Sequence, residues 1–343
     1  MMDKVKVLLY GVGAVGRLIA RNLLKKEGIK VVGAIDIAKD KIGKDLGEIL
    51  GMSRNLGLKV SDNVTSLLEN DRPDVAVHAT SSFLRDTYEQ IIPLVKASIN
   101  VVSTCEELSF PSIAEPKLTK DLNILAKKHG ATVLGTGINP GFLMDTLVIT
   151  LTAACIEIER IEAARVMDAS TRRLPFQKKI GAGLTVEEFK EKMKSGKITG
   201  HVGLEQSIAM IGDALKWNIE DIIVDEVKPV ITKKPVRNRN FSIDVGGVTG
   251  LKQKAKGIVD NNEIIVLDFQ AYIGAEEEYD KIMIKGIPNI NSRIKPCVHG
   301  DKGTIAMVVN SIPRIINAQA GLFTMKDLPV PSGTPRDIRK YLL

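Results

Sequence analysis

The sequence predicts an α/β protein in two parts: a doubly wound parallel sheet in the first half, followed by a second α/β domain. A glycine-rich loop at residues 11–16 separates an apolar run from a helical pattern. Four further apolar runs alternate with helical patterns up to about residue 141, and strands separated by helices favour a parallel sheet. Beyond about residue 156, apolar and polar residues alternate, which is typical of strands in a sheet covered on one face.

Length and composition restrict the class of protein. A chain of 343 residues is more often two domains than one, and 44% hydrophobic with 26% charged residues is typical of a globular protein. No apolar run approaches the roughly 18 residues that a membrane span requires. The N-terminus has no signal-peptide pattern, so we expect a cytoplasmic protein without a membrane partner.

The cysteines and histidines are scattered along the chain. Cys105, Cys155 and Cys297 are odd in number and far apart, which favours reduced thiols over a disulfide framework. No pair of them has the spacing of metal ligands, and we therefore expect no metal site.

The net charge of +7 and the pI near 9.1 raise the question of a nucleic-acid partner. Most lysines are mixed with acids, as in residues 25–30 and 187–197, and mixed charge indicates solvated surface. The two densest basic stretches, 171–179 and 232–240, match no nucleic-acid-binding motif. We expect no nucleic acid to bind, and a small phosphate-bearing ligand accounts for some of the positive charge.

The first apolar run, 4–10, leads directly into the glycine-rich loop and a helical pattern. Gly11 permits a tight turn, Gly13 lets the backbone approach a pyrophosphate, and Gly16 lets the helix pack closely on the strand. The helix N-terminus offers free N–H groups and a positive dipole to phosphates. This is the arrangement of a Rossmann fold, and the residues expected to bind a dinucleotide are Gly11, Val12, Gly13, Ala14, Val15 and Gly16.

Asp36 ends the second apolar run, 20 residues after Gly16. An acid at this position hydrogen-bonds the adenosine ribose hydroxyls of NAD and repels the 2′-phosphate of NADP. We therefore expect NAD to be the preferred cofactor. Lys39 and Lys41 follow closely and offset part of that repulsion, which keeps NADP open as a second cofactor.

Ligands of doubly wound sheets bind beyond the carboxyl ends of the strands. The run 74–82 brings three hydroxyls to this edge, and Thr80, Ser81 and Ser82 are candidate cofactor contacts. Capping of the following helix is an equally suitable role for each of them. His78 lies in the apolar part of the run, which favours a hydrogen-bonded core histidine over a catalyst.

Two adjacent acids, Glu106 and Glu107, follow the next apolar run. Carboxylates at the end of a buried strand are costly unless a partner or a reaction uses them. Capping of the following turn is the structural alternative. Cys105, beside them, is interpreted as small packing, because nothing in the sequence supplies it with a base.

The second half contains one clear amphipathic helix, 203–217, between strand patterns. A later helical pattern, about 303–318, is expected to return to the first domain; Asn310 is a candidate cofactor contact by that route, with plain packing as the alternative. We expect three parts: a dinucleotide-binding domain at 1–145, a substrate-binding and dimerisation domain at 146–302, and a C-terminal segment at 319–343.

Four segments carry a resemblance to a known family: 11–16, 103–111 (STCEELSFP), 135–147 (GTGINPGFLMDTL) and 309–331 (VNSIPRIINAQAGLFTMKDLPVP). In these the chain resembles the family of 2,4-diaminopentanoate dehydrogenases and native amine dehydrogenases. The resemblance implies an architecture like that of dihydrodipicolinate reductase. In it, a second α/β domain carries an open mixed sheet that supplies the substrate pocket and often the contact of a homodimer.

The resemblance also implies a reaction. It is the NAD(P)-dependent oxidative deamination of 2,4-diaminopentanoate, an intermediate of ornithine degradation, to 2-amino-4-oxopentanoate and ammonia. The alternatives are a simpler amine or ketone, or the cyclic imine acid of a dihydrodipicolinate-type reductase. A regulatory protein that binds NAD without turnover is a different class, and it would have no use for a proton acceptor.

Site residues follow from the same resemblance. The catalytic glutamate falls at Glu106, with Glu107 as the alternative, and a raised pKa would let it accept a proton near neutral pH. Pro140 and Gly141 are expected to shape a turn. The substrate contacts implied are Asn139, Phe142, Arg165 and His201. For Arg165 an interdomain salt bridge is the alternative, and for His201 a helix cap.

Overall fold

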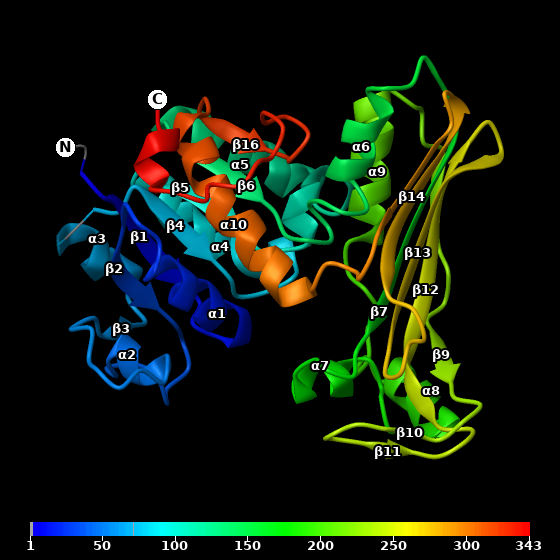
Figure 1. Cartoon of the computed structure of the whole chain (residues 1–343). Helices are drawn as coiled ribbons and strands as arrows, with labels where there is room; N and C mark the ends of the chain where they lie inside the picture. Colours follow the sequence, from blue (N-terminus) through cyan, green and yellow to red (C-terminus); the bar gives the residue numbers. More distant parts are fainter. Residues whose placement is uncertain (1–2, 71) are drawn as a thin grey trace. The chain divides into compact units, whose positions relative to one another are not determined.

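The computed structural model describes residues 3–70 and 72–343 (Figure 1). Contacts within the chain divide it into two units. The first contains the chain up to Phe142 together with Gly300–Leu343, and the second contains Leu143–His299. Each unit is described by itself.

The sheet of the first unit is parallel throughout its described strands. Its order is β16-β6-β5-β4-β1-β2-β3. The chain therefore adds strands on one side of β1 up to β3 and on its other side from β4 onward. This is the doubly wound Rossmann order, as the sequence predicted. The strands are β1 (Val5–Tyr10), β2 (Ile29–Ile35), β3 (Val60–Ser61), β4 (Val75–His78), β5 (Asn100–Ser103), β6 (Thr132–Gly135) and β16 (Gly321–Phe323).

The register brings the carboxyl ends of the central strands to one level. Tyr10 pairs with His78, His78 with Ser103, and Ser103 with Gly135. These four residues form a row across the sheet, and the loops that follow them start side by side. The strand ends at which the site is predicted therefore lie on one continuous line.

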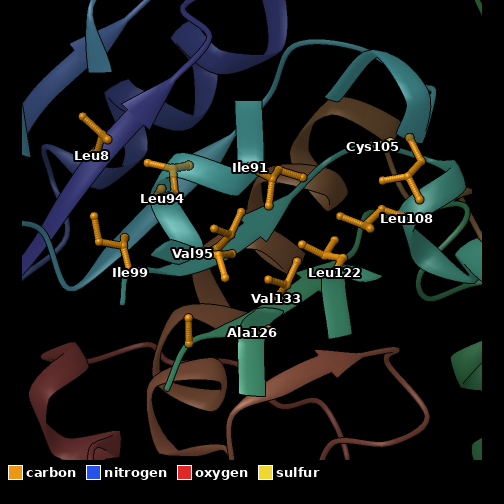
Figure 2. Close-up of a cluster of buried hydrophobic side chains, with 14 of the residues drawn as sticks. Leu8, Ile91, Leu94, Val95, Ile99, Cys105, Leu108, Leu122, Ala126 and Val133 are labelled. Atoms are coloured by element: carbon orange, nitrogen blue, oxygen red, sulfur yellow. The ribbon is translucent and has the colours of Figure 1, made fainter. Parts of the chain in front are cut away.

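Helices cover both faces of this sheet. Buried side chains of α4 and α5, such as Ile91 and Leu122, pack with Val133 of the sheet (Figure 2), while α10 packs on α1, β5 and β6. The helices of the unit are α1 (Ala14–Leu23), α2 (Leu46–Ile49), α3 (Val64–Asn70), α4 (Leu84–Lys96), α5 (Pro116–His129) and α10 (Gly300–Asn317), with 3₁₀ turns η1 (Glu107–Ser109), η2 (Pro111–Ile113) and η3 (Ile338–Tyr341).

The core of this unit also anchors the acidic turn. Cys105 and Leu108 flank the two glutamates, and both are part of the buried cluster (Figure 2). Burial of an apolar side chain contributes roughly 1.5–3 kcal/mol. The backbone of Glu106 and Glu107 is therefore tied to the core at both ends.

The second unit contains a mixed sheet of order β15-β14-β7-β13-β12-β8, with β9 also paired to β12. β7 and β13 are parallel, and the other described pairs are antiparallel. Its strands are β7 (Glu157–Asp168), β8 (Asp221–Val224), β9 (Lys228–Ile231), β12 (Val248–Val259), β13 (Asn262–Tyr272), β14 (Tyr279–Ile287) and β15 (Ile290–Ile294); β10 (Val236–Arg237) and β11 (Ser242–Ile243) form a separate ribbon.

One face of the second sheet lies under a helix. α9 packs on β8, β12 and β13, and alternate strand residues such as Ile161, Ala163 and Leu267 are buried. The residues between them, such as Glu162 and Asp268, remain partly exposed, as the period of two predicts. The helices are α6 (Thr146–Thr152), α7 (Leu174–Lys179), α8 (Val186–Lys194) and α9 (Leu204–Leu215). No helix in the described part of the chain is long and apolar enough to cross a membrane.

Candidate functional site

The glycine loop has the geometry that its spacing predicts. Gly11 has φ +96°, in the left-handed region that favours glycine, and a Cβ there would lie 2.3 Å from the Ala79 carbonyl oxygen. A Cβ on Gly16 would lie 1.9 Å from the Gly11 carbonyl oxygen, so α1 packs directly on the loop. At Gly13, apart from its neighbours in the chain, no described atom lies within 4 Å of a Cβ position. The backbone at Gly13 is therefore open to a ligand.

The N-terminus of α1 faces the same loop. Gly13 is its N-cap, and among the described residues no side chain caps the helix and no acid lies in its first turn. Uncapped N–H groups and the helix dipole favour an anion at this position. Val12, Ala14 and Val15 lie in this loop and first turn, so the segment fits the pyrophosphate of a dinucleotide.

Asp36 is bonded to the glycine loop. Its carboxylate accepts hydrogen bonds from the Val12 N–H (2.9 Å), the Ala38 N–H (3.0 Å) and the Lys41 ammonium (2.7 Å). Burial alone would raise the pKa of Asp36, but the hydrogen bonds from Lys41, Ala38 and Val12 outweigh it and lower the pKa. The carboxylate is thus held ionised beside the loop, with Lys41 as its counter-ion.

The hydroxyl residues after β4 hold the loop against α4. The Thr80 hydroxyl donates to Gln90 Oε1 (2.8 Å), and the Ser81 hydroxyl donates to Asp86 (2.8 Å). The Ser82 carbonyl accepts the N–H of Glu107 (3.1 Å). The Ser81 Oγ also accepts the N–H of Phe83, the residue before α4 (3.4 Å). Contact of these residues with a cofactor stays a prediction.

The two acids have different surroundings. Glu107 Oε2 accepts the N–H of Leu84 at the start of α4 (2.7 Å), so this carboxylate caps a helix. Glu106 precedes η1, and its carbonyl accepts the Ser109 hydroxyl (2.7 Å). Burial raises the pKa of the neighbouring Cys105 thiol to about 12, so this cysteine is packing and no nucleophile. The catalytic role of Glu106, with Glu107 as the alternative, stays a prediction.

The segment after β6 forms a fixed turn at the same edge. Gly141 has φ +119°, and a Cβ there would lie 2.5 Å from the Gly137 nitrogen. The Asn139-Pro140 peptide bond is cis. Asn139 and Phe142 are half-buried in this turn. Pro140 and Gly141 thus shape the turn as expected, while substrate contacts at Asn139 and Phe142 stay predictions.

Thr136, in the same segment, is a candidate that sequence reasoning missed. Its N–H donates to the Ser103 carbonyl (2.8 Å), which places it beside the acidic strand end. Its side chain is 2% exposed, and its hydroxyl has no hydrogen-bond partner among the described residues. A buried polar group without a partner costs about 1–3 kcal/mol. No sequence signal distinguishes such a threonine, because its isolation depends on the strand register.

Asn310 binds the C-terminal segment. Its Oδ1 accepts the Thr334 N–H (2.9 Å) and the Thr334 hydroxyl (2.7 Å). These bonds attach the C-terminal segment to α10, which suits the packing alternative. Contact of Asn310 with the cofactor stays a prediction.

Arg165 is engaged inside the second unit. It is 1% exposed, and Nη1 forms an ion pair with Asp280 Oδ1 (2.6 Å), while Nη2 donates to the Val298 carbonyl. A substrate carboxylate would have to compete with this buried pair, and breaking such a pair costs about 3–5 kcal/mol. The salt bridge of Arg165 therefore lies within the second unit, and contact of Arg165 with substrate stays a prediction.

His201 lies near Arg165 on the helix-covered face. Its ring stacks on Phe269 with centroids 4.1 Å apart, and Phe269 pairs with Arg165 across the strands. Burial, with the charges of Lys179 and Arg165, lowers the pKa of His201 to about 3, so the imidazole is neutral at physiological pH. The N-cap residue of α9 is Gly203, two residues after His201. Contact of His201 with substrate stays a prediction.

Together these features define a class of protein. A Rossmann sheet with this strand order, an open glycine loop and an acid after β2 are the features of a dinucleotide-binding protein. The described residues contain no cluster of three or more His, Cys, Asp or Glu that could hold a metal ion.

Comparison with known proteins identifies the family. Residues 142–342 match the 2,4-diaminopentanoate dehydrogenase C-terminal domain, and residues 5–105 match the N-terminus of dihydrodipicolinate reductase. The chain is 38% identical to 2,4-diaminopentanoate dehydrogenase of Acetoanaerobium sticklandii, over 99% of this chain and 98% of that protein. The chain belongs to the 2,4-diaminopentanoate dehydrogenase family, and it is an amine-acting oxidoreductase.

Amine dehydrogenases are further relatives. The structure of amine dehydrogenase from Mycobacterium smegmatis matches with a TM-score of 0.83 and 27% identity, over 97% of this chain and 98% of that one. Amine dehydrogenase of Streptomyces virginiae is 22% identical over 98% of this chain and 99% of that protein. Dihydrodipicolinate reductase from Paenisporosarcina sp. TG-14 matches at TM-score 0.54 and 14% identity, over 94% of this chain and 99% of that one, which shows a common fold.

The unpartnered hydroxyl of Thr136 gives a testable prediction. Thr136→Val removes the hydroxyl and keeps the branched shape. We expect the free energy of unfolding without ligand to stay within about 1 kcal/mol or to rise, because a buried polar group without a partner is lost. We expect the KM for the dinucleotide or for the amine to rise several-fold. Thermal unfolding and steady-state kinetics on the same variant measure both; a loss of stability above about 2 kcal/mol would contradict the assignment.

Proposed function

We propose that this protein catalyses the NAD(P)-dependent oxidative deamination of 2,4-diaminopentanoate to 2-amino-4-oxopentanoate and ammonia, a step of ornithine degradation. The observation that carries the proposal is 38% identity, over nearly the full length of both chains, to a protein of that name. The open glycine loop at Gly13, the orphaned hydroxyl of Thr136 and the acidic turn fit a dinucleotide and an amine at one edge.

A second candidate function is oxidation of a simpler amine. The likeness to the amine dehydrogenase of Mycobacterium smegmatis covers both units of the chain and supports it. The two candidates share the chemistry at Glu106 and differ in the substrate.

The chemistry requires a proton acceptor. An amine loses hydride only as the free base, and the iminium that forms must then be attacked by water. A carboxylate at Glu106 accepts the ammonium proton and releases it to solvent. Ionised again, it faces the positive charge of the iminium, accepts a proton from the attacking water, and returns that proton to the nitrogen as ammonia leaves. The bound nicotinamide supplies the hydride acceptor. Glu107, fixed to α4, holds the turn on which Glu106 lies.

One assay tests both the proposed substrate and the proposed proton acceptor, Glu106. Purified protein is mixed with NAD or NADP and with 2,4-diaminopentanoate or a monoamine, and formation of the reduced nicotinamide is followed by absorbance. We expect turnover with 2,4-diaminopentanoate. We expect Glu106→Gln to lower kcat by about 10²–10⁴-fold, the usual contribution of a general base, with dinucleotide binding unchanged.

Glu107→Gln is the matched control, since it removes a neighbouring charge of the same kind. We expect it to lower the free energy of unfolding by about 1 kcal/mol through a weakened cap, with a smaller loss of kcat. Turnover with monoamines alone would overturn the proposed substrate. Full activity of Glu106→Gln would overturn the proposed acid.

We infer that NAD is preferred over NADP. The Asp36 carboxylate supports this, because it lies beside the glycine loop and would repel a 2′-phosphate. Lys41 is the residue that would meet that phosphate if Asp36 were absent, since its ammonium is 2.7 Å from the carboxylate.

A cofactor switch tests this inference. We expect Asp36→Ser to raise the ratio of kcat/KM for NADP to that for NAD by about tenfold or more, since it removes a repulsion and frees a cation. Adding Lys41→Ala in the same chain should reverse most of the gain. An unchanged ratio in Asp36→Ser would remove Asp36 from the ribose site.

We also propose a homodimer formed through the partly exposed face of the second sheet. A C2 contact patch must complement itself, so it needs both signs of charge. This face carries Lys254 and Asp268, and a groove of about 630 Å³ on it is lined in part by Tyr272 and Tyr279.

Solution mass tests the dimer. We expect light scattering to give twice the chain mass of 37.4 kDa. Val266→Glu places a charge in the middle of the face and should give monomers, whereas Ile156→Glu changes a side chain that is already 86% exposed and should not. A monomeric wild-type protein at micromolar concentration would exclude the dimer.

A further inference from the structure

His78 ends β4 in the row across the first sheet, and it is fully buried. Its two ring nitrogens both have polar partners: Nδ1 lies 2.9 Å from Ser103 Oγ, and Nε2 lies 2.9 Å from Gln90 Oε1. The Tyr10 ring packs beside it, with centroids 5.3 Å apart. Burial lowers the pKa of His78 to about 4, although the Gln90 hydrogen bond raises it, so the ring is neutral and carries one N–H.

The neighbours determine which nitrogen carries the hydrogen. The Gln90 amide nitrogen donates to the Asp86 carbonyl (3.2 Å), which turns Oε1, an acceptor only, toward the imidazole. Nε2 is therefore the N–H, and Nδ1 is the acceptor. The Ser103 hydroxyl donates its one hydrogen to Nδ1, and its oxygen accepts the N–H of Cys105 (3.1 Å).

Each side of the ring leads to a different part of the site. On the Nδ1 side, Ser103 holds the backbone of Cys105, the residue before Glu106. On the Nε2 side, Gln90 Oε1 also accepts the Thr80 hydroxyl (2.8 Å), which itself lies 3.1 Å from Nε2. The loop after β4 and the acidic turn after β5 are thus joined through one imidazole. Burying a ring with two polar nitrogens is costly unless both are bonded, and here both are.

We propose that His78, held as the Nε2–H tautomer, is a positioning residue that sets the distance between the loop of Thr80 and the acidic turn of Glu106. The Nδ1 side orients the carboxylate that accepts the proton, and the Nε2 side orients the loop that faces the cofactor. The inference rests on the proposed function, because it takes Glu106 and the dinucleotide as the groups that must be aligned.

The proposal predicts that variants on the two sides of the ring change different constants, kcat on one side and the Kd for the dinucleotide on the other. Ser103→Ala removes the Nδ1 side; we expect kcat to fall about 10–100-fold, since small misplacement of a reacting group has effects of that size, while the Kd for the dinucleotide stays within about twofold. Gln90→Met removes the acceptor that Nε2–H and the Thr80 hydroxyl share. We expect the Kd to rise about fivefold, the loss of roughly one hydrogen bond, with kcat within about twofold. Kd is measured by fluorescence titration with the reduced dinucleotide, independently of turnover.

Thr132→Val is the matched control. Thr132 is 1% exposed and its hydroxyl donates to the Gln319 carbonyl (2.9 Å). The variant therefore loses a buried hydroxyl at the start of β6, at the opposite end of the strand from Gly135. We expect a change in stability and no change in Kd or kcat. The proposal fails if each of Ser103→Ala and Gln90→Met changes both kcat and Kd, or if neither variant changes kcat or Kd. His78 is then a packing residue.

The tautomer is measured on wild-type protein as a second test, and a variant is used only to assign the signal. Nitrogen chemical shifts of the imidazoles, with His78 assigned by the signal lost in His78→Asn, report the tautomer of each of the four histidines. We expect His78 as Nε2–H without titration across roughly pH 6–9. An Nδ1–H tautomer or an imidazolium would overturn the proposal. If no amine is oxidised, the proposed function fails, whereas the tautomer and the Kd of Gln90→Met still decide this inference.

Discussion

The candidate site depends on the register of four parallel strands. Tyr10, His78, Ser103 and Gly135 pair in one row, so the loops after β1, β4, β5 and β6 leave the sheet at a common level. A slip of one residue in any strand would exchange its buried and facing side chains. The glycine loop, the Thr80 loop, the acidic turn and the turn after β6 are brought together by this pairing, although they are distributed over more than 120 residues of chain.

At this edge, the residues that hold the backbone in place differ from the residue proposed to transfer the proton. Glu107 is bonded to α4, Cys105 and Leu108 are buried in the core, and Asp36 is bonded to the glycine loop and to Lys41. These contacts hold the backbone where ligands are expected, which lowers the cost of ordering the site on binding.

Sequence reasoning succeeds where the signal is local. The strand before the glycine loop, the spacing of its glycines and Asp36 all depend on a few neighbouring residues, and the structure confirms the fold that they predict. It fails where pairing partners are distant: β3 and β16 are two and three residues long and exist through their neighbours, and Arg165 meets Asp280 across 115 residues. The bond of Glu107 to α4 is of the same kind, because it joins residues 23 positions apart.

The most direct test of the central claim is a crystal structure of the Glu106→Gln variant with NAD and 2,4-diaminopentanoate bound. The account predicts that the amine to be oxidised lies within hydrogen-bond distance, about 3 Å, of the side chain at position 106. It also predicts the pyrophosphate at Gly13 and the α1 N-terminus. An amine placed beside Glu107, or beside no acid of this turn, would contradict it.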